Sequence, residues 1–188
     1  SSWAILTSDS TRYWFHEVSD AARTGPLGAV SNQSWNGLVH RPPFNGDRVG
    51  TAVWLVLSLA TLAGGITLTR WLVAGSRTIE AVMVLALTEV VVSPVSWTHH
   101  WSWLALAPIV AASVWSVHRS VGIALLALVG LAVVAPYLWI RHSPASYVAS
   151  NSLVLGGAVV LVIWFVAEAR QRRARRSDLD VDVSPHVP

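Results

Sequence analysis

Apolar residues dominate the chain between residues 51 and 167, in runs separated by short polar segments. A helix rises 1.5 Å per residue, so roughly 20 apolar residues cross the hydrocarbon core of a bilayer. The pattern therefore predicts an all-α polytopic membrane protein with about five transmembrane helices. The expected spans are residues 51–69, 79–92, 101–117, 121–140 and 147–167, the fourth kinked or ended near Pro136.

Residues 1–50 contain no apolar run of that length and are predicted to lie outside the bilayer or on its surface. Asp9 or Ser10 can cap a helix that Gly25-Pro26 stops. The polar and apolar residues of this helix fall on different faces, which favours a position in the plane of the membrane interface. We interpret residues 1–50 as an extracytoplasmic loop that carries an interfacial helix.

The composition fits this prediction, because 53% of the 188 residues are hydrophobic and only 12% are charged. All 13 basic residues are arginines, and five of them lie within residues 170–176, directly after the last apolar run. Arginines favour the cytoplasmic side, so residues 169–188 are interpreted as a disordered cytoplasmic tail of a plasma-membrane protein. The absence of cysteine excludes disulfides and thiolate metal sites.

Alternation of the spans then assigns a side to every connecting segment. The arginines that follow the first and third runs come to the cytoplasmic face, in agreement with the positive-inside rule. Residues 1–50, 93–100 and 141–144 come to the outer face. The polar run at residues 31–37 and the junction at residues 93–103 are therefore expected on the same side of the membrane.

Residues 93–103 combine serine, histidine and tryptophan side chains between two apolar runs. Pro94 cannot continue a helix, and the backbone groups it leaves free need Ser96, Thr98 or a ligand as partners. His99 and His100 point about 100° apart on a helix, which suits two different partners better than one metal ion. The alternative is an aromatic belt whose side chains face lipid headgroups. The candidate site residues of this junction are Ser93, Ser96, Trp97, His99, His100 and Trp101.

Glu89 lies one helical turn before Ser93, about 6 Å below the junction. A carboxylate inside an apolar span is a functional candidate, because it needs water, a cation or a polar cavity. The alternative is a structural ion pair with Arg48 or His99. Glu80, near the other end of the same run, is expected to snorkel or to cap the helix.

The run at residues 31–37 is rich in amides and hydroxyls, which offer the paired donors and acceptors that sugar hydroxyls require. Its candidate substrate-binding residues are Asn32, Gln33, Ser34, Trp35 and Asn36. The alternative is a turn between the interfacial helix and the following loop. The run also matches the N-glycosylation pattern, a three-residue signal that recurs by chance.

These motifs resemble the C-terminal half of the polyprenyl-phosphate-mannose-dependent alpha-1,2-mannosyltransferases of glycosyltransferase family 87, from mycobacteria and related actinobacteria. The resemblance rests on Ser1-Ser2-Trp3, Tyr13-Trp14, Asn32-Gln33-Ser34 with Gly37, and above all the pattern Ser-Pro-x-Ser-Trp-x-His-His-Trp at residues 93–101. It implies a membrane enzyme of the GT-C type, present here as a C-terminal fragment. Such a hexosyltransferase moves mannose from a lipid-phosphate donor to a glycolipid or lipoglycan acceptor on the outer face of the plasma membrane.

The resemblance also implies roles for the candidate residues. His99 and His100 would hold the departing phosphate or shuttle a proton, the amides of residues 32–36 would orient sugar hydroxyls, and Trp35, Trp97 or Trp101 would stack on a sugar face. The family's catalytic aspartate is expected upstream of residue 1, so no base is assigned and the chain alone is expected to be inactive.

Other functions stay open on the sequence alone. A transporter or flippase segment would use Glu89 and the paired histidines as a proton-coupled path. A non-catalytic membrane scaffold would use the basic tail for docking. No metal ligand set is assigned and no cofactor is certain, although a divalent metal ion is an alternative to histidine or arginine as the partner of the phosphate. The expected partners are the lipid-phosphate donor, the acceptor and membrane lipids, with no nucleic acid.

Overall fold

The computed structural model describes residues 7–13, 15, 25–140 and 146–182. Within these ranges the chain is helical and has no β-strand, apart from an isolated antiparallel bridge between Asn32 and Trp97. The expected all-α class is confirmed. The described helices are α2 (Thr7–Arg12), α3 (Trp35–Val39), α4 (Arg48–Ala74), α5 (Thr78–Val92), the 3-10 helix η3 (Thr98–Leu106), α6 (Ala107–Val114), α7 (Arg119–Ile140), α8 (Ser146–Ser150) and α9 (Ser152–Asp182).

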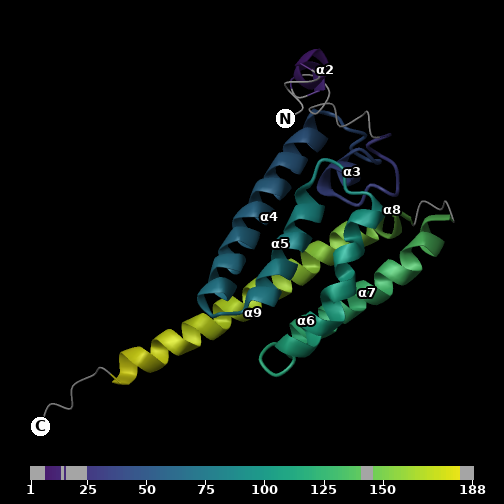
Figure 1. Ribbon diagram of the computed structural model, residues 1–188. Coiled ribbons are helices and arrows are strands. Elements are labelled where there is room, and N and C mark those ends of the chain that lie inside the picture. The colour runs from purple at the N-terminus through teal and green to yellow at the C-terminus, as the bar shows by residue number, and fades with distance from the viewer. Residues whose placement is uncertain (1–6, 14, 16–24, 141–145, 183–188) are drawn as a thin grey trace, which may run out of the picture.

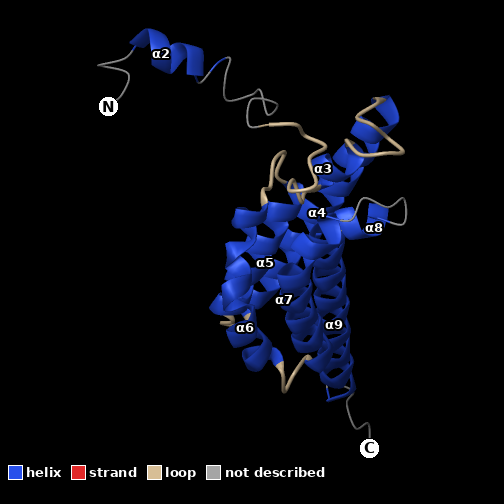
Figure 2. Ribbon diagram, turned by 90° about the vertical axis from the view of Figure 1, so that its right-hand side faces the viewer, coloured by secondary structure: helices blue, strands red, loops and turns tan. Residues whose placement is uncertain are grey.

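Helix α5 lies at the centre of the bundle. It contacts α4, η3, α6 and α9, while α7 packs on α6 and α9. Figure 2 shows α7 and α9 side by side, with the short helices α3 and α8 at one end. The C-terminal part of α9 lies at the other end (Figure 1). Buried aliphatic and tryptophan side chains fill the space between the helices, among them Leu87, Leu125 and Trp164.

Two helices are long and apolar enough to cross a membrane within the described residues, namely Arg48–Ala74 and Ser152–Asp178. The segment Arg119–Ala135 is a shorter apolar helix. Only 11% of the most apolar window of α4 is buried in the bundle, so large aliphatic side chains cover its outer face. Such a surface requires lipid or protein around it. The prediction of five spans goes beyond these two helices and stays a prediction.

The third apolar run was predicted to form one α-helix over residues 101–117, and the structure differs from this prediction. The chain forms a 3-10 helix from Thr98 to Leu106 and is α-helical only from Ala107 to Val114. Pro108 explains the change, because proline lacks the N–H that would bond to the carbonyl of Leu104. By contrast, α7 runs through Pro136 and ends at Ile140.

The tail was expected to be disordered, and this is wrong as far as Asp182, where α9 ends. Its alanines, arginines and glutamine are strong helix formers. In addition, the Arg172 Nε lies 3.4 Å from Glu168 one turn earlier, and the Arg172 guanidinium donates to the carbonyl of Trp71 at 2.7 Å. Residues 183–188 lie outside the described residues.

Two further boundaries differ from the predicted ones. The fifth run is interrupted at Asn151, which separates α8 from α9. Of the interfacial helix expected from Asp9 or Ser10 onward, the structure describes α2, which begins at Thr7 and ends at Arg12. Most of the predicted remainder, residues 16–24, lies outside the described residues.

Candidate active site

The loop at residues 25–47 carries the amide-rich run and covers one end of the bundle. The side chains of Asn32, Gln33 and Ser34 in this loop have no exposed surface. A buried polar group without a hydrogen bond is costly, so these side chains need partners within the protein.

Gln33 joins the loop to the break between α8 and α9. Its Nε2 donates to the carbonyl oxygens of Ser150 and Val30, both at 2.6 Å. Its Oε1 accepts the backbone N–H of Leu153 at 3.0 Å. Gln33 therefore satisfies backbone groups that the end of one helix and the start of the next leave unpaired.

Asn32 and Asn36 join the loop to the junction that follows α5. The Oδ1 of Asn32 accepts the backbone N–H of Ser96 at 2.9 Å, and the backbone N–H of Gln33 donates to the carbonyl of Ser96 at 2.7 Å. The Nδ2 of Asn36 donates to the carbonyl of Pro94 at 2.9 Å. The loop thus supplies partners to the backbone that Pro94 frees, a role predicted for Ser96, Thr98 or a ligand.

The helix α3 begins within the same run. The Oγ of Ser34 caps it by accepting the N–H of Gly37 at 3.1 Å. The next residue, Trp35, is 6% exposed and donates its Nε1–H to the Thr61 hydroxyl on α4 at 3.0 Å. Trp35 therefore lies against α4 and α9, away from the histidines.

A buried arginine that the sequence analysis did not single out fixes this loop. Arg41 is 5% exposed, and its guanidinium donates to the carbonyls of Ala29 and Asn32 and to the Oδ1 of Asn151. Burial lowers the pKa of Arg41 to about 10, an effect that Tyr147 partly offsets. The group still carries its charge at neutral pH, and only the fold identifies it, because Asn151 is distant in sequence.

The supported junction forms one wall of an open groove of about 750 Å³. Glu89 lines it from α5, and His99, His100 and Trp103 line it from η3. The α5 residues Val82, Leu85 and Ala86 form an apolar floor at the helical spacing that leads to Glu89. The structure thus brings together the three titratable residues that the sequence singled out on this side of the chain.

The two imidazoles in the groove face different directions. The ring centroids of His99 and His100 are 4.4 Å apart and their planes meet at 79°. Neither ring, nor the Glu89 carboxylate, makes a side-chain hydrogen bond or ion pair to another described residue. The alternative pairings of Glu89 with Arg48 or His99 are therefore not formed in the structure, and these groups are free to meet a ligand.

The other candidate residues do not line this groove. Trp101 is 4% exposed and its ring packs against Gly157 of α9, whereas Trp97 is half-buried near Gly25. Ser96 is fully buried, and the Ser93 hydroxyl donates to the carbonyl of Val95 at 2.8 Å. Direct contact of the buried amides with a sugar would require the loop to open. Conversely, the groove is also lined by Ser102 and Trp103, which were not predicted to bind a ligand.

The described residues contain no group of three histidine, aspartate or glutamate side chains able to hold a metal ion. Asp47, one of the acidic residues on this side, accepts the N–H of Gly50 at 2.6 Å as the cap of α4. Its carboxylate therefore has a structural partner.

Fold and groove define a class of helical protein whose membrane-length helices carry a polar site at one end. Residues 1–94 match the model of glycosyltransferase family 87, and the chain belongs to this family. The matched range ends at Pro94, so the paired histidines lie just beyond it.

Mycobacterial relatives extend the similarity over nearly the whole chain. A polyprenol-phosphate-mannose-dependent alpha-(1-2)-phosphatidylinositol mannoside mannosyltransferase of Mycobacterium tuberculosis is 37% identical over 69% of the chain and 30% of its own length. A protein of the same description from Mycolicibacterium smegmatis is 30% identical over 97% of the chain and 45% of its own length.

A polyprenol-phosphate-mannose-dependent alpha-(1-2)-phosphatidylinositol pentamannoside mannosyltransferase of Mycolicibacterium smegmatis is 32% identical over 55% of the chain. The chain covers 25% of the length of this relative. The chain thus spans less than half the length of each of these relatives. No solved structure matches the chain.

Proposed function

We propose that the full-length gene product transfers mannose from a polyprenyl phosphate donor to a hydroxyl of a phosphatidylinositol mannoside at the outer face of the plasma membrane. Membership of family 87 carries this proposal, and the names of the mycobacterial relatives give its donor and acceptor classes. The groove lined by Glu89, His99, His100 and Trp103 contributes part of the site.

The chemistry of the groove suits this transfer. The acceptor oxygen forms a bond to C1 of mannose while the bond from C1 to the phosphate oxygen breaks. Polyprenyl phosphate leaves with the bonding electrons, and the acceptor proton passes to a base that is not assigned to a residue of this chain. His99 and His100 offer N–H donors, or a proton, to the phosphate as its negative charge grows.

The remaining groove residues suit the sugar. The Glu89 carboxylate accepts hydrogen bonds from sugar hydroxyls, and Trp103, 47% exposed, offers an aromatic face on which a sugar ring can stack. The apolar floor made by Val82 and Leu85 lies beside these groups, where the first isoprene units of the donor would enter. A lipid-linked sugar thus meets polar and apolar walls in one groove.

Two exposed tryptophans provide a matched test. Trp103 lines the groove, whereas Trp115, 42% exposed, lies beyond the other end of α6. We expect Trp103→Ala in the full-length gene product to lower kcat/KM for mannosyl transfer about tenfold, and Trp115→Ala to change it less than about twofold. The assay follows labelled mannose from polyprenyl phosphate mannose into membrane acceptors, at matched protein levels.

Equal rates for both variants would remove the groove from the proposed site. Transfer that proceeds equally well from a nucleotide-linked mannose, with the polyprenyl donor absent, would contradict the donor assignment itself.

A further inference from the structure

A second polar pocket lies at the opposite end of α5 from the histidine groove. Its volume is about 420 Å³, and its walls come from the end of α4, the α4–α5 connection and α9. Arg77 in this pocket precedes Glu89 in the groove by 12 residues, or about 18 Å along a helix. The two sites therefore do not share a ligand headgroup.

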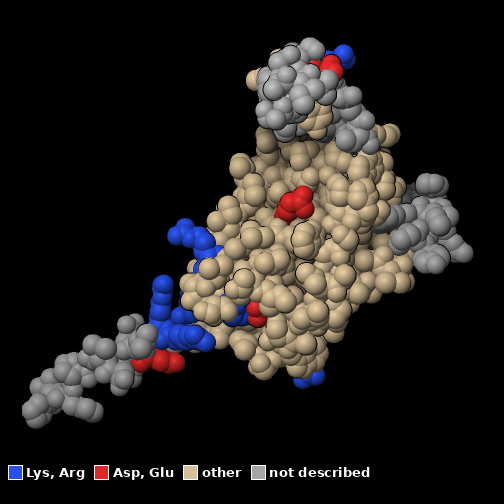
Figure 3. Space-filling model, in the orientation of Figure 1, with Lys and Arg blue, Asp and Glu red and all other residues tan. Residues whose placement is uncertain are grey.

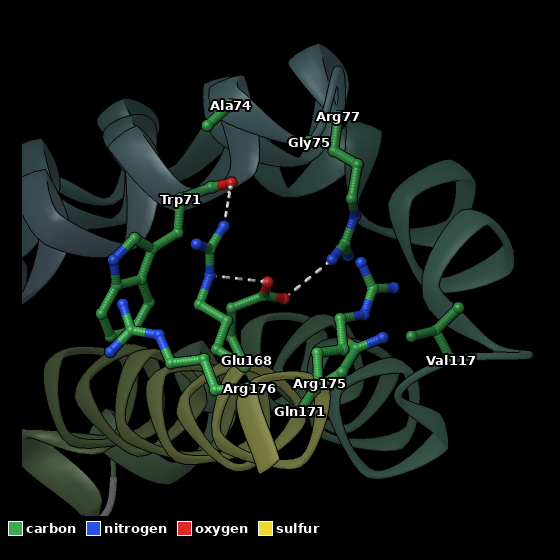
Figure 4. A pocket seen from close by; sticks show the side chains of 10 residues that line it. Trp71, Ala74, Gly75, Arg77, Val117, Glu168, Gln171, Arg175 and Arg176 are labelled. Atoms are coloured by element: carbon green, nitrogen blue, oxygen red, sulfur yellow. Dashed lines mark hydrogen bonds and ion pairs between the residues drawn. The ribbon is translucent and has the colours of Figure 1, made fainter. Parts of the chain in front are cut away.

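The pocket carries an excess of positive charge. Four arginines line it, Arg77, Arg172, Arg175 and Arg176, and Glu168 is its only acidic lining residue among those the structure describes. Glu168 pairs with Arg77 at 2.8 Å and with Arg172 at 3.4 Å. Figure 4 shows these pairs, with Arg175 extending from α9 toward Arg77 and Arg176 extending toward Trp71.

Arg175 and Arg176 have no such partner. Neither makes a hydrogen bond or an ion pair with any side chain in the described part of the chain. Figure 3 shows blue atoms gathered at this end of the molecule, while the face above them is nearly free of charge. Two unneutralised guanidinium groups beside a cavity form a site for an anion that presents several oxygens, such as a phosphate.

An apolar groove adjoins the basic pocket on the same pair of helices. It has a volume of about 550 Å³ and is lined from α4 and α9 by residues that include Gly64, Leu68 and Phe165. Trp71, which lines the basic pocket, contacts Phe165 at a centroid distance of 5.0 Å. The basic pocket and the apolar groove therefore adjoin each other where Trp71 contacts Phe165. Together they form one continuous seam between α4 and α9.

We propose that this seam binds an anionic glycerophospholipid, with the phosphate in the pocket that Arg175 and Arg176 line and an acyl chain along the α4–α9 groove. A free phosphate would need only the arginine pocket, and a neutral lipid only the apolar groove. The arginine pocket adjoins the apolar groove at the end of membrane-length helices. This arrangement matches a lipid that carries both a charged headgroup and an apolar chain.

The chain offers matched variants for each half of the site. Arg175→Gln with Arg176→Gln removes two charges from the pocket, while Arg170→Gln with Arg173→Gln removes two exposed charges from α9 outside it. For the acyl groove, a Cβ added at Gly64 would meet nothing within 4 Å, so Gly64→Leu is the variant that places an aliphatic side chain in the groove. Gly130→Leu, on α7 and equally unobstructed, is its control.

The test measures phosphatidylglycerol retained by the detergent-purified full-length gene product in native mass spectrometry, against phosphatidylcholine and with inorganic phosphate as competitor. We expect the Arg175/Arg176 pair to weaken phosphatidylglycerol binding about tenfold and the Arg170/Arg173 pair less than about threefold. Gly64→Leu should reduce lipid binding while Gly130→Leu does not.

Equal losses in the two arginine pairs would overturn the pocket in favour of non-specific attraction. Equal retention of phosphatidylcholine, or complete competition by millimolar inorganic phosphate, would overturn the lipid assignment. Because this experiment measures lipid binding and not mannosyl transfer, its result does not depend on the proposed enzymatic function.

Discussion

Arg41 joins the loop at residues 25–47 to the break between α8 and α9 through one buried guanidinium. It binds carbonyls of the loop at Ala29 and Asn32 and the side chain of Asn151 at the break between α8 and α9. Lysine keeps the charge but presents its donors from a single atom, so it cannot reach all of these groups at once.

We therefore expect both Arg41→Ala and Arg41→Lys to destabilise the protein, the alanine variant by about 3 kcal/mol because it leaves buried acceptors unpaired. Arg48→Ala, at an exposed arginine, should change stability by less than about 0.5 kcal/mol. Thermal unfolding followed by tryptophan fluorescence in detergent measures the difference. Indistinguishable unfolding midpoints for Arg41→Ala and Arg48→Ala would refute the role of Arg41.

The residues of the groove illustrate which contacts a sequence can predict. Glu89 and the histidines flank Pro94 within a few turns, so local helix geometry was enough to predict their proximity. Local helix geometry could not predict the partners of the amides, because these partners are distant in the sequence. Gln33 binds the carbonyl of Ser150, 117 residues away, and Asn32 binds the backbone of Ser96, 64 residues away. Composition favoured sugar binding for these amides, whereas in the structure they join the loop to the junction after α5 and to the break between α8 and α9.

Helix α4 packs on α5 through one of two adjacent glycines. A Cβ at Gly65 would overlap Thr88 of α5, while a Cβ at Gly64 would meet nothing within 4 Å. The pair lies at the middle of the first apolar run, but only the packing distinguishes its two members.

Gly65→Ala is expected to lower the unfolding midpoint by several degrees, because the added Cβ forces α4 away from α5. The expected loss of stability is about 1–3 kcal/mol. Gly64→Ala should be neutral or stabilising by up to about 1 kcal/mol, since alanine is the better helix former. The same thermal unfolding assay compares them. A larger loss of stability in Gly64→Ala than in Gly65→Ala would contradict the packing of α4 on α5.

The apolar runs predicted where the helices lie better than they predicted the type of each helix or the residue at which it ends. The run at residues 79–92 became α5, Thr78–Val92, because it contains no proline or glycine. The run that contains Pro108 divided into a 3-10 helix and an α-helix. The arginine-rich tail continued α9, since its side chains favour a helix and pair with Glu168 and Trp71. Polarity alone suggested disorder there.

For the whole molecule, the two ends of α5 carry opposite chemistry, with histidines and Glu89 at one end and arginines at the other. We propose that the arginine end faces the cytoplasm and the groove faces outward. This assignment places the groove where a lipid-linked sugar on the outer face would meet it.

Single cysteines test this sidedness, because the chain has none of its own. Ser102→Cys, exposed in the groove, should react with a membrane-impermeant maleimide added to intact cells. Ser116→Cys, exposed between α6 and α7, should react only after permeabilisation. The reverse pattern would invert the proposed topology.

The central claim is that the histidine groove takes part in mannosyl transfer. Its most direct test is transfer from polyprenyl phosphate mannose to membrane acceptors in cells that carry the full-length gene, comparing wild type with His99→Ala and His100→Ala at matched protein levels. The account predicts a loss of at least about a hundredfold for one or both variants, as expected when a group that stabilises a developing phosphate charge is removed. Unchanged transfer in both variants would contradict it and leave the histidines as contacts to lipid headgroups.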